Sequence, residues 1–333
     1  MLQQLVDFFE GHSMQQTLQQ LLFAVALAIA CSPAFSQPFA YVPNEKDGTV
    51  SVIDTSTDAV VKRLPLKGKL GNKIQAAAIH PSNQKLYVVV RDKNAVAVID
   101  VVQGKQTALI KVGDEPEGID ISPDGKLLAA CLEEENAVSL VDLQSNKLKH
   151  TIATQGRNPE HCVFSPDQQW LLASNEESND VDVINLNTLK SEHVIAATKH
   201  PRGVGFSPDG KWAYVANEAA SLLEIVSTAD WKVQANIKVG LRSNGVKVNA
   251  DGSRIYVSNG GDHNISVIDT ASRQVIATIA VGQRPWNMAL TPDGKKLYVA
   301  NGRSNSVSVI DTQTNQRLKD IAVGNLPWGV VIH

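Results

Sequence analysis

The sequence predicts an all-β fold, a seven-bladed β-propeller made of four-stranded antiparallel blades. Two markers recur together through most of the chain. The first is a turn of the type SPDG, which recurs at nearly constant spacing at Pro81, Pro123, Pro166, Pro208, Ala250 and Pro292. The second is a motif that is mostly VID and ends at Asp54, Asp100, Asp142, Asn185, Ser227, Asp269 and Asp311. Apart from the step of 46 residues from Asp54 to Asp100, both spacings fall in the range of about 40 to 45 residues that, with four strands per unit, is typical of a propeller blade.

Residues 285–324 show the strands of one unit in order. WNMAL is the apolar first strand, and the turn TPDG follows it. In this turn Pro292 presets φ, and Gly294 can take the positive φ that closes a hairpin. KKLYVAN and SVSVID predict the second and third strands, and RLKDIAVG predicts the fourth. The short connections favour antiparallel pairing, and we interpret the recurring VID acids as structural because their side chains can bond their own turns.

The two ends of the repeat region are complementary fragments of one unit. Six complete units follow from Ile74 onward. Residues 38–66 supply segments for strands two to four without a first strand, whereas residues 328–333 (WGVVIH) supply a first strand alone. A single four-stranded unit cannot bury both faces, but a closed ring does so and leaves only short edges. We therefore expect residues 328–333 to pair with residues 38–45 and complete the seventh blade.

The N-terminal residues 1–36 differ from the repeats and predict a signal peptide. Leu21–Ala30 is an uncharged apolar run that is too short to span a bilayer but suits a signal-peptide core. The small residues Ala34 and Ser36 stand three and one before a predicted cleavage site ahead of Gln37. We expect residues 37–333 to form the propeller of a periplasmic protein.

Two alternatives remain at this end of the chain. No Lys or Arg precedes the apolar run, so Met14 is a candidate start of translation. Cleavage ahead of Cys31 competes with cleavage ahead of Gln37, because AIAC faintly resembles a lipobox. In that case the protein is lipid-anchored through Cys31.

Composition excludes some classes of partner. The chain has 31 basic and 34 acidic residues, and of these only Asp7 and Glu10 precede residue 37, so the predicted mature protein is nearly neutral. Such a protein has no general attraction for nucleic acid or for an anionic membrane. Cys131 and Cys162 remain, both in apolar strand segments, where buried thiols and a disulfide are alternatives. We expect a monomer without a transmembrane anchor.

The motif KLYVAN…NSVSVIDTQTNQ…AVG…P resembles that of the YVTN-type seven-bladed β-propellers, and the resemblance covers residues 38–333. The two ends, YVPNEKDGTVSVID and VGNLPWGVVIH, are similar to those of exported propeller proteins associated with PQQ-dependent catabolism. The resemblance implies a bacterial, exported propeller beside a periplasmic quinoprotein dehydrogenase or its transport system. It implies little about mechanism, because one fold serves many functions. We expect this chain to hold no cofactor.

The loops that lead into the first strands, called leading loops below, are predicted to meet on one face around the tunnel, where propellers usually bind ligands. The residues after the leading-loop proline, in register, are Gln75, Glu117, Glu160, Arg202, Asn244, Trp286 and Trp328. Those before it are Lys73, Glu115, Asn158, His200, Arg242, Arg284 and Leu326. Repeats that agree at core positions disagree here, which indicates an asymmetric site. We predict that the ligand-binding residues are Glu117, Glu160, Arg202, Asn244, Trp286, Trp328, His200, Arg242 and Arg284.

Each group of candidates has an alternative role. Trp286 and Trp328 can stack on a flat ligand or seal the hydrophobic seam at the closure. The arginines can clamp an anion or pair with neighbours such as Glu160. Glu160, His161 and His200 include metal-ligand types but lack tight ligand spacing, so no metal is predicted.

The loops that join the second strand to the third, called second loops below, are acidic. They contain Glu45, residues 133–136 (EEEN), residues 176–178 (EES) and Glu218. Such a rim can dock a basic partner or remain a solvated face, and the solvated face is the expectation.

The sequence contains no GxSxG nucleophile motif, no phosphate-binding glycine loop and no CxxCH haem motif. The leading hypothesis is a non-catalytic, exported propeller that binds a small molecule or a periplasmic protein. The alternative is a lactonase-type hydrolase like some seven-bladed propellers with similar repeats, with Arg202, Glu160 and His200 as its candidate residues. Single-stranded nucleic-acid binding would use basic residues with the tryptophans, and the nearly neutral charge argues against it.

Overall fold

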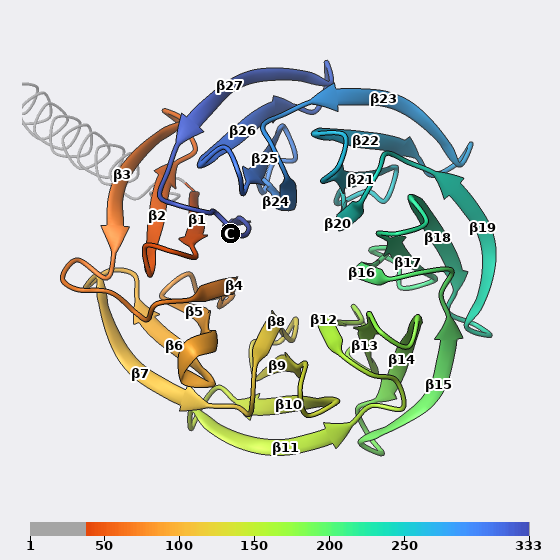
Figure 1. Ribbon diagram of the computed structural model, residues 1–333, viewed down its shortest axis with the longest axis horizontal. Coiled ribbons are helices and arrows are strands. Elements are labelled where there is room, and N and C mark those ends of the chain that lie inside the picture. The colour runs from red at the N-terminus through yellow and green to blue at the C-terminus, as the bar shows by residue number, and fades with distance from the viewer. Residues whose placement is uncertain (1–37, 333) are drawn as a thin grey trace, which may run out of the picture. The chain divides into compact units, whose positions relative to one another are not determined.

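The computed structural model describes residues 38–332, which form seven four-stranded sheets arranged as a ring around a central tunnel (Figure 1). Within a sheet the strands follow one another from the innermost, beside the tunnel, to the outermost, and the pairings are antiparallel. The predicted seven-bladed propeller is confirmed. The predicted signal peptide, its cleavage site and the alternative anchor at Cys31 lie outside the described residues.

The blades are numbered here from the one that closes the ring. Blade 1 contains β28 (Val331–Ile332), β1 (Phe39–Asn44), β2 (Thr49–Asp54) and β3 (Ala59–Leu64). Blade 2 contains β4 (Ile74–Ile79), β5 (Lys85–Val90), the 3₁₀ helix η1 (Arg91–Lys93), β6 (Ala95–Asp100) and β7 (Lys105–Lys111). Blade 3 contains β8 (Pro116–Ile121), β9 (Leu127–Leu132), β10 (Ala137–Asp142) and β11 (Lys147–Ala153). Blade 4 contains β12 (Pro159–Phe164), β13 (Trp170–Asn175), β14 (Asp180–Asn185) and β15 (Lys190–Ala196).

The remaining three blades repeat this pattern. Blade 5 contains β16 (Pro201–Phe206), β17 (Trp212–Asn217), β18 (Leu222–Ser227) and β19 (Lys232–Lys238). Blade 6 contains β20 (Ser243–Val248), β21 (Arg254–Asn259), β22 (Asn264–Asp269) and β23 (Gln274–Ala280). Blade 7 contains β24 (Pro285–Leu290), β25 (Lys296–Asn301), β26 (Ser306–Asp311) and β27 (Gln316–Ala322).

The hydrophobic core lies between neighbouring blades. The second strands are buried along almost their whole length, as in β25, because each sheet is covered by another blade on both faces. The outermost strands are mostly exposed. In β27, for example, only Ile321 is buried. One of the clusters joins Val50 and Val52 of blade 1 to Leu86 and Val88 of blade 2. Each blade is thus held in place by packing against its two neighbours. The innermost strands border the tunnel, where their side chains are available for a functional site.

The C-terminal strand closes the ring as predicted. Ile332 of β28 pairs with Ala40 of β1, and a further bridge joins Pro327 to Asn44. The regular strand β28 is shorter than the predicted strand 328–333, because the backbone does not pair with β1 between the bridge at Pro327 and the pairing at Val331. First strands of other blades show the same irregularity after the leading-loop proline, or after Ser243 at the equivalent position of blade 6. The bulge is therefore a property of the repeat.

Turn acids and cysteines take structural positions. Oδ1 of Asp54 accepts a hydrogen bond from the backbone nitrogen of Ser56 at 2.8 Å, and Asp142 accepts one from Ser145 at 2.7 Å. These acids close their own turns. Cys131 and Cys162 are free, buried thiols in one core cluster, so the structure favours buried thiols over a disulfide.

None of the helices described within residues 38–332 is long and apolar enough to cross a membrane.

Candidate functional site

Two sets of residues converge on one mouth of the tunnel. The first set follows the leading-loop prolines. The second set consists of the first residue after each second strand, namely Glu45, Arg91, Glu133, Glu176, Glu218, Gly260 and Gly302. Backbone hydrogen bonds connect the two loops within a blade, as from Glu176 N to Asn158 O at 3.0 Å and from Glu218 N to His200 O at 2.8 Å. The repeat thus brings both sets to the same level of the ring.

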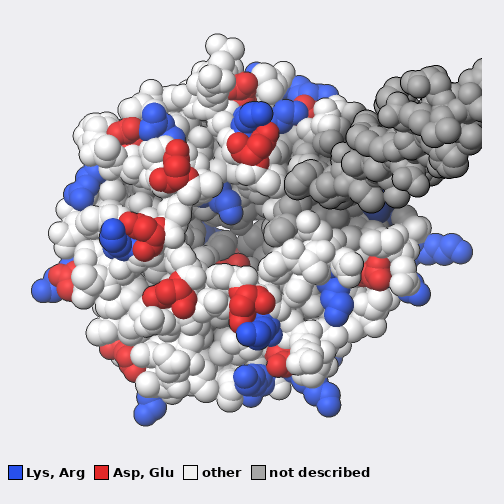
Figure 2. Space-filling model, turned by 180° about the vertical axis from the view of Figure 1, so that it is seen from behind, with Lys and Arg blue, Asp and Glu red and all other residues white. Residues whose placement is uncertain are grey.

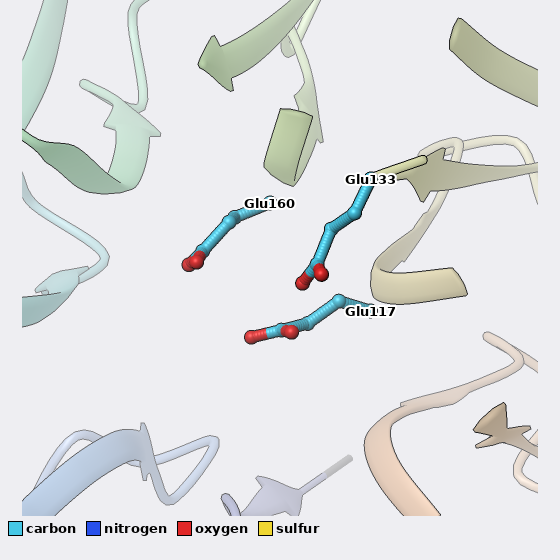
Figure 3. A group of neighbouring side chains, drawn as sticks. All are labelled: Glu117, Glu133 and Glu160. Atoms are coloured by element: carbon cyan, nitrogen blue, oxygen red, sulfur yellow. The ribbon is translucent and has the colours of Figure 1, made fainter. Parts of the chain in front are cut away.

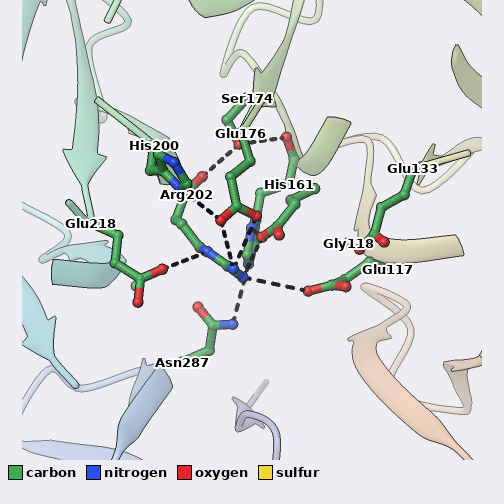
Figure 4. Close-up of polar contacts among 12 residues, drawn as sticks. Glu117, Gly118, Glu133, His161, Ser174, Glu176, His200, Arg202, Glu218 and Asn287 are labelled. Carbon is green, nitrogen blue, oxygen red and sulfur yellow. Dashed lines mark hydrogen bonds and ion pairs between the residues drawn. The ribbon is translucent and has the colours of Figure 1, made fainter. Parts of the chain in front are cut away.

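Arg202 is the centre of one ion-pair network at this mouth (Figure 4). Its Nη1 lies 2.5 Å from Glu160 Oε2 and 3.9 Å from Glu117 Oε1. Its Nη2 lies 3.0 Å from Glu176 Oε2, and its Nε lies 2.8 Å from Glu218 Oε2. One guanidinium group from blade 5 therefore meets carboxylates from blades 3, 4 and 5.

Arg91 is the centre of a second network, which the sequence did not reveal. Its Nη1 lies 2.6 Å from Glu117 Oε2, and its Nη2 lies 2.5 Å from Glu133 Oε2 and also contacts Glu115. Nη1 also donates to Gln75 Oε1 at 3.4 Å. Glu117 contacts both arginines and so joins the two networks. An alignment of the repeats could have indicated it, because Arg91 is the one basic residue at the first position after the second strand, where four other blades carry glutamate.

The second loops form only part of the solvated acidic rim that we expected. Glu133, Glu176 and Glu218 are each paired with an arginine, and their side chains are 9%, 18% and 11% exposed. The prediction is wrong for these three residues, whereas Glu134, Glu135 and Glu177 are exposed as expected. The three paired carboxylates compensate the arginines, which a buried cation requires. Of the two roles considered for the arginines, the structure supports pairing with carboxylates such as Glu160.

The carboxyl groups of the network differ in proton affinity. Burial raises the pKa of Glu117 and of Glu160, and neighbouring carboxyl groups raise both further against the opposing charge of Arg202. Burial also acts to raise the pKa of Glu176, but its hydrogen bonds and the charges of Arg202 and His200 outweigh burial and lower it to about 2. Neighbouring acids with separated pKa values are a feature of acid–base sites. Glu117 and Glu160 hold a proton more readily than Glu176 does.

A plug of three side chains divides the tunnel below this network. The rings of His161 and Trp328 stack with centroids 5.6 Å apart and an interplanar angle of 22°. Asn287 reaches across the tunnel, and its Nδ2 lies 3.5 Å from His161 Nε2. Burial lowers the pKa of His161 to about 3, so the imidazole is neutral at neutral pH. We call His161, Asn287 and Trp328 the plug.

Above the plug lies a cavity of about 380 Å³, called the mouth cavity below. Of the predicted site residues, Glu117, Arg202, Asn244, Trp286, Trp328 and Arg284 line it. Glu160 is buried beside Arg202, and His200 Nδ1 lies 2.9 Å from Glu176 Oε1. Arg242 is exposed and lies outside the lining. The cavity also contains Gln75, Lys73, Glu45, His161, Asn287 and Arg303.

The two tryptophans differ in their surroundings. Trp328 is 8% exposed and belongs to a core cluster, whereas Trp286 is half-buried and packs against the edge of that cluster. Gly302 leaves room for the Trp286 ring, because a Cβ there would lie 2.8 Å from Cζ3. Trp328 thus fills the structural role considered for the pair, and Trp286 keeps a face toward the cavity.

Three carboxylates form a candidate cation-binding group (Figure 3). Oxygen atoms of Glu117, Glu133 and Glu160 lie within 4.8 Å of one another. Carboxylate oxygens suit hard cations, but each of these groups already contacts Arg91 or Arg202. A metal ion would have to displace guanidinium groups, so the arrangement fits the arginines better than a metal. His161 and His200, which the sequence analysis considered as metal-ligand types beside Glu160, do not belong to this group.

Comparison with known proteins identifies related sequences and folds. The sequence matches the profile of the family described as lactonase, seven-bladed β-propeller, over residues 29–151 and 186–323. No curated protein matches the chain. Among solved structures, hydrazine synthase of Kuenenia stuttgartiensis shares 25% identity over 82% of this chain and 92% of that chain, with a TM-score of 0.74.

Two further structures resemble this chain in fold. One is a periplasmic gluconolactonase of Pseudomonas aeruginosa, with 19% identity, coverage of 89% of this chain and 98% of that chain, and a TM-score of 0.74. The other is a protein of unknown function from Desulfotomaculum acetoxidans, with 17% identity, coverage of 88% and 98%, and a TM-score of 0.78.

The family match includes Glu117, Arg91 and Arg202, and its internal gap contains Glu160 and Glu176. Because the matched segments cover well over half of the sequence, the chain belongs to the seven-bladed β-propeller lactonase family.

Proposed function

We propose that this protein is a hydrolase that opens the ring of a small, hydroxylated lactone. The observation that carries the proposal is the pairing of Glu117, a buried carboxyl group of raised pKa, with Arg202 in one cavity of a chain that belongs to a lactonase family. The family match favours this hydrolase over the non-catalytic binding platform that was the leading sequence hypothesis. A sugar-acid lactone is the proposed substrate class, by analogy with the gluconolactonase of similar fold.

Glu117 is the proposed general base. In its ionised form it accepts a proton from a water molecule, and the water oxygen then attacks the lactone carbonyl carbon. The tetrahedral oxyanion collapses, the ring C–O bond breaks, and the leaving alkoxide takes up the proton from Glu117. The products are one hydroxyl group and one carboxylic acid, and the acid releases the second proton of the water to solvent at neutral pH and becomes a carboxylate, so no other reactant is needed. A raised pKa suits this role because it makes the carboxylate a stronger base.

Arg202 is the proposed electrostatic partner of the oxyanion. Its guanidinium group lines the mouth cavity and is held by carboxylates on its other sides, so its position is fixed before substrate binds. Lys73, Arg284 and Arg303 also line the cavity and favour the carboxylate product over the neutral substrate.

The rest of the cavity suits a polyhydroxylated ring. The amides of Gln75, Asn244 and Asn287 offer donors and acceptors for hydroxyl groups, and Trp286 offers an apolar face. The volume of about 380 Å³ lies in the usual range of about 300–1,000 Å³ for small-molecule sites.

The proposed place of action is the periplasm, on the basis of the predicted signal peptide. Dehydrogenation of a cyclic hemiacetal yields a lactone, so a lactonase would consume the product of a sugar-oxidising quinoprotein dehydrogenase. This links the hydrolase to the resemblance to PQQ-associated propellers. N-terminal sequencing of the protein from a periplasmic extract should start at Gln37, and a full-length chain in the cytoplasm would contradict export.

The activity is tested with a panel of γ- and δ-lactones of sugar acids, followed by proton release with the uncatalysed rate subtracted. We expect wild-type protein to hydrolyse at least one of them, with kcat/KM rising with pH as Glu117 ionises. Glu117→Gln should lower kcat/KM by about 10²–10⁴-fold while the protein stays folded, since this is the usual contribution of a general base. Arg242→Ala is the matched control at an exposed residue and should retain full activity.

Two results would overturn the proposal. If wild-type protein hydrolyses no lactone of the panel, the binding platform becomes the better explanation. If Glu117→Gln keeps wild-type kcat/KM, the base lies elsewhere.

A further inference from the structure

A second cavity occupies the tunnel on the other side of the plug, and we call it the inner cavity. Its volume is about 400 Å³, and it extends from Trp328 and His161 to the turns at Pro81 and Pro123. Most of its lining is aliphatic, but Asp120 and Lys247 also belong to it. Figure 2 shows one face of the molecule, where acidic and basic side chains are interspersed around a hollow at the centre of the ring.

One register of the first strands supplies both charges. Three residues after each leading-loop residue, the seven blades carry Ala78, Asp120, Val163, Gly205, Lys247, Ala289 and Val331. Six of the seven line the inner cavity, Gly205 being the exception. Five of the seven residues are small or aliphatic, as a ring with only a packing role requires. The two exceptions carry opposite charges and face one cavity, so they indicate a binding function.

The strands that carry the two charges lie on different sides of the tunnel. Asp120 is on β8 of blade 3 and Lys247 is on β20 of blade 6, and Figure 1 shows these strands separated across the tunnel. A carboxylate oxygen of Asp120 accepts a hydrogen bond from the backbone nitrogen of Phe164 at 2.9 Å. A carboxylate has about four acceptor sites, so Asp120 can still receive further donors.

The Lys247 ammonium group forms no hydrogen bond or ion pair with any residue in the range 38–332. It therefore does not pair directly with Asp120, and a gap separates the two charges. Burial raises the pKa of Asp120 to about 6, and the positive charge of Lys247 opposes that rise. Asp120 is thus mostly ionised at neutral pH and attracts Lys247 across the cavity. Lys247 is exposed to the tunnel and Asp120 is half-buried, so both charges are accessible to a ligand that fills the gap.

We propose that the inner cavity is a second binding site, which takes a small zwitterion with its carboxylate on Lys247, its ammonium group on Asp120 and its hydrocarbon part against the aliphatic walls. A zwitterion satisfies both ends and leaves the charge balance of the cavity unchanged. A simple anion would pair with Lys247 but would be repelled by the carboxylate of Asp120. A simple cation would pair with Asp120 but would be repelled by the ammonium group of Lys247. The site is separate from the mouth cavity because the plug lies between them.

Calorimetric titration with a homologous series of ω-amino acids, from glycine to 8-aminooctanoate, tests the proposal. The series varies only the distance between ammonium and carboxylate, so it measures the gap. We expect affinity to peak at one chain length, and the monocarboxylate and the monoamine of that length to bind about tenfold more weakly or worse, because hydrogen bonds to charged groups contribute about 1.5–3 kcal/mol.

Lys247→Met and Asp120→Asn should each lower the affinity for the best chain length by about tenfold or more. Asp120→Asn keeps an acceptor for Phe164, and Lys238→Met, at an exposed lysine on the outer strand β19, is the matched control with unchanged affinity. The proposal is overturned if no member of the series binds at millimolar concentration. A flat dependence on chain length, which needs no variant to measure, would overturn it too, as would full binding by folded Lys247→Met protein.

Discussion

The mouth of the tunnel has two halves built on the same backbone registers but with different chemistry. In blades 3, 4 and 5 the leading-loop residues are Glu117, Glu160 and Arg202. In the other four blades these positions carry two amides and two tryptophans, Gln75, Asn244, Trp286 and Trp328. The first half holds a dense ion-pair network, and the second offers aromatic and amide surfaces.

The second loops differ in the same way. Glu133, Glu176 and Glu218 follow the second strands of the charged half. Glu176 and Glu218 pair with Arg202 of blade 5, and Glu133 pairs with Arg91 of blade 2. Gly260 and Gly302 stand at the same register in blades 6 and 7, where a side chain would collide with Arg284 or Trp286. The choice between glutamate and glycine thus decides whether a blade presents a fixed charge or makes room for a large side chain. A repeated backbone becomes an asymmetric site by single-residue changes at two registers.

Arg202→Ala should have the largest effect on stability. It leaves Glu160, Glu176 and Glu218 near one another without their shared cation, and breaking a buried pair typically costs about 3–5 kcal/mol. Urea unfolding gives the free energy of unfolding, with Arg157→Ala, at an exposed arginine 3.8 Å from Glu177, as the control. A loss below about 1 kcal/mol, the usual worth of a surface pair, would show that water screens the charged half.

The two tryptophans at the leading-loop positions of blades 7 and 1 should separate into two roles. Trp328→Ala removes a side chain that packs in the core, so we expect the free energy of unfolding to fall by about 3–5 kcal/mol. Trp286→Ala should lower stability less and should weaken substrate binding, since stacking contributes about 1–3 kcal/mol. Thermal unfolding of both variants measures the loss of stability, and their KM values measure the loss of substrate binding. Equal losses of stability would contradict the distinction.

The charged half should make stability depend on pH through Glu117. Its pKa is raised in the folded state, so its contribution to stability is present below the ordinary value of 4.5 and is lost as pH rises through the raised value. Glu117→Gln removes this titration and keeps a hydrogen-bond acceptor for Arg91. The variant should therefore gain stability relative to wild type with rising pH, by at most about 1.4 kcal/mol per pH unit. Urea unfolding between about pH 4 and 8 measures the difference, and a difference that shrinks with rising pH would contradict the assignment.

Arg242→Ala should have the smallest effect. Arg242 occupies the same register as His200 and Arg284 but is exposed and lies outside the mouth cavity. Surface substitutions of this kind usually change the free energy of unfolding by less than about 0.5 kcal/mol. Thermal unfolding and lactone hydrolysis should both match wild type. A clear loss of activity would extend the site beyond the mouth cavity.

The repeat made the fold predictable, together with the position of the leading-loop residues around the tunnel. Turn and VID markers located the strands, and the leading-loop proline located Glu117 and Arg202 at the tunnel. Pairing across blades could not be predicted, because the sequence gives register within a blade but not the direction of a long side chain. Arg91 was missed for this reason, and Glu176 was assigned to solvent although it reaches Arg202. The inner charges were missed because Asp120 and Lys247 each stand between two aliphatic residues of a first strand, at a register where the other blades carry small or aliphatic residues.

The closure of blade 1 has a consequence for the order of events during synthesis. Six blades have all their strands in one continuous stretch, so each can assemble as it leaves the ribosome. Blade 1 waits for β28, which is made last, and until then β1 keeps an unpaired edge. Trp328 arrives with the same segment, so the plug and the mouth cavity are completed in the same step that ends exposure of this edge. A nascent chain is therefore open to misassembly until the ring closes, and its mouth cavity is incomplete until then.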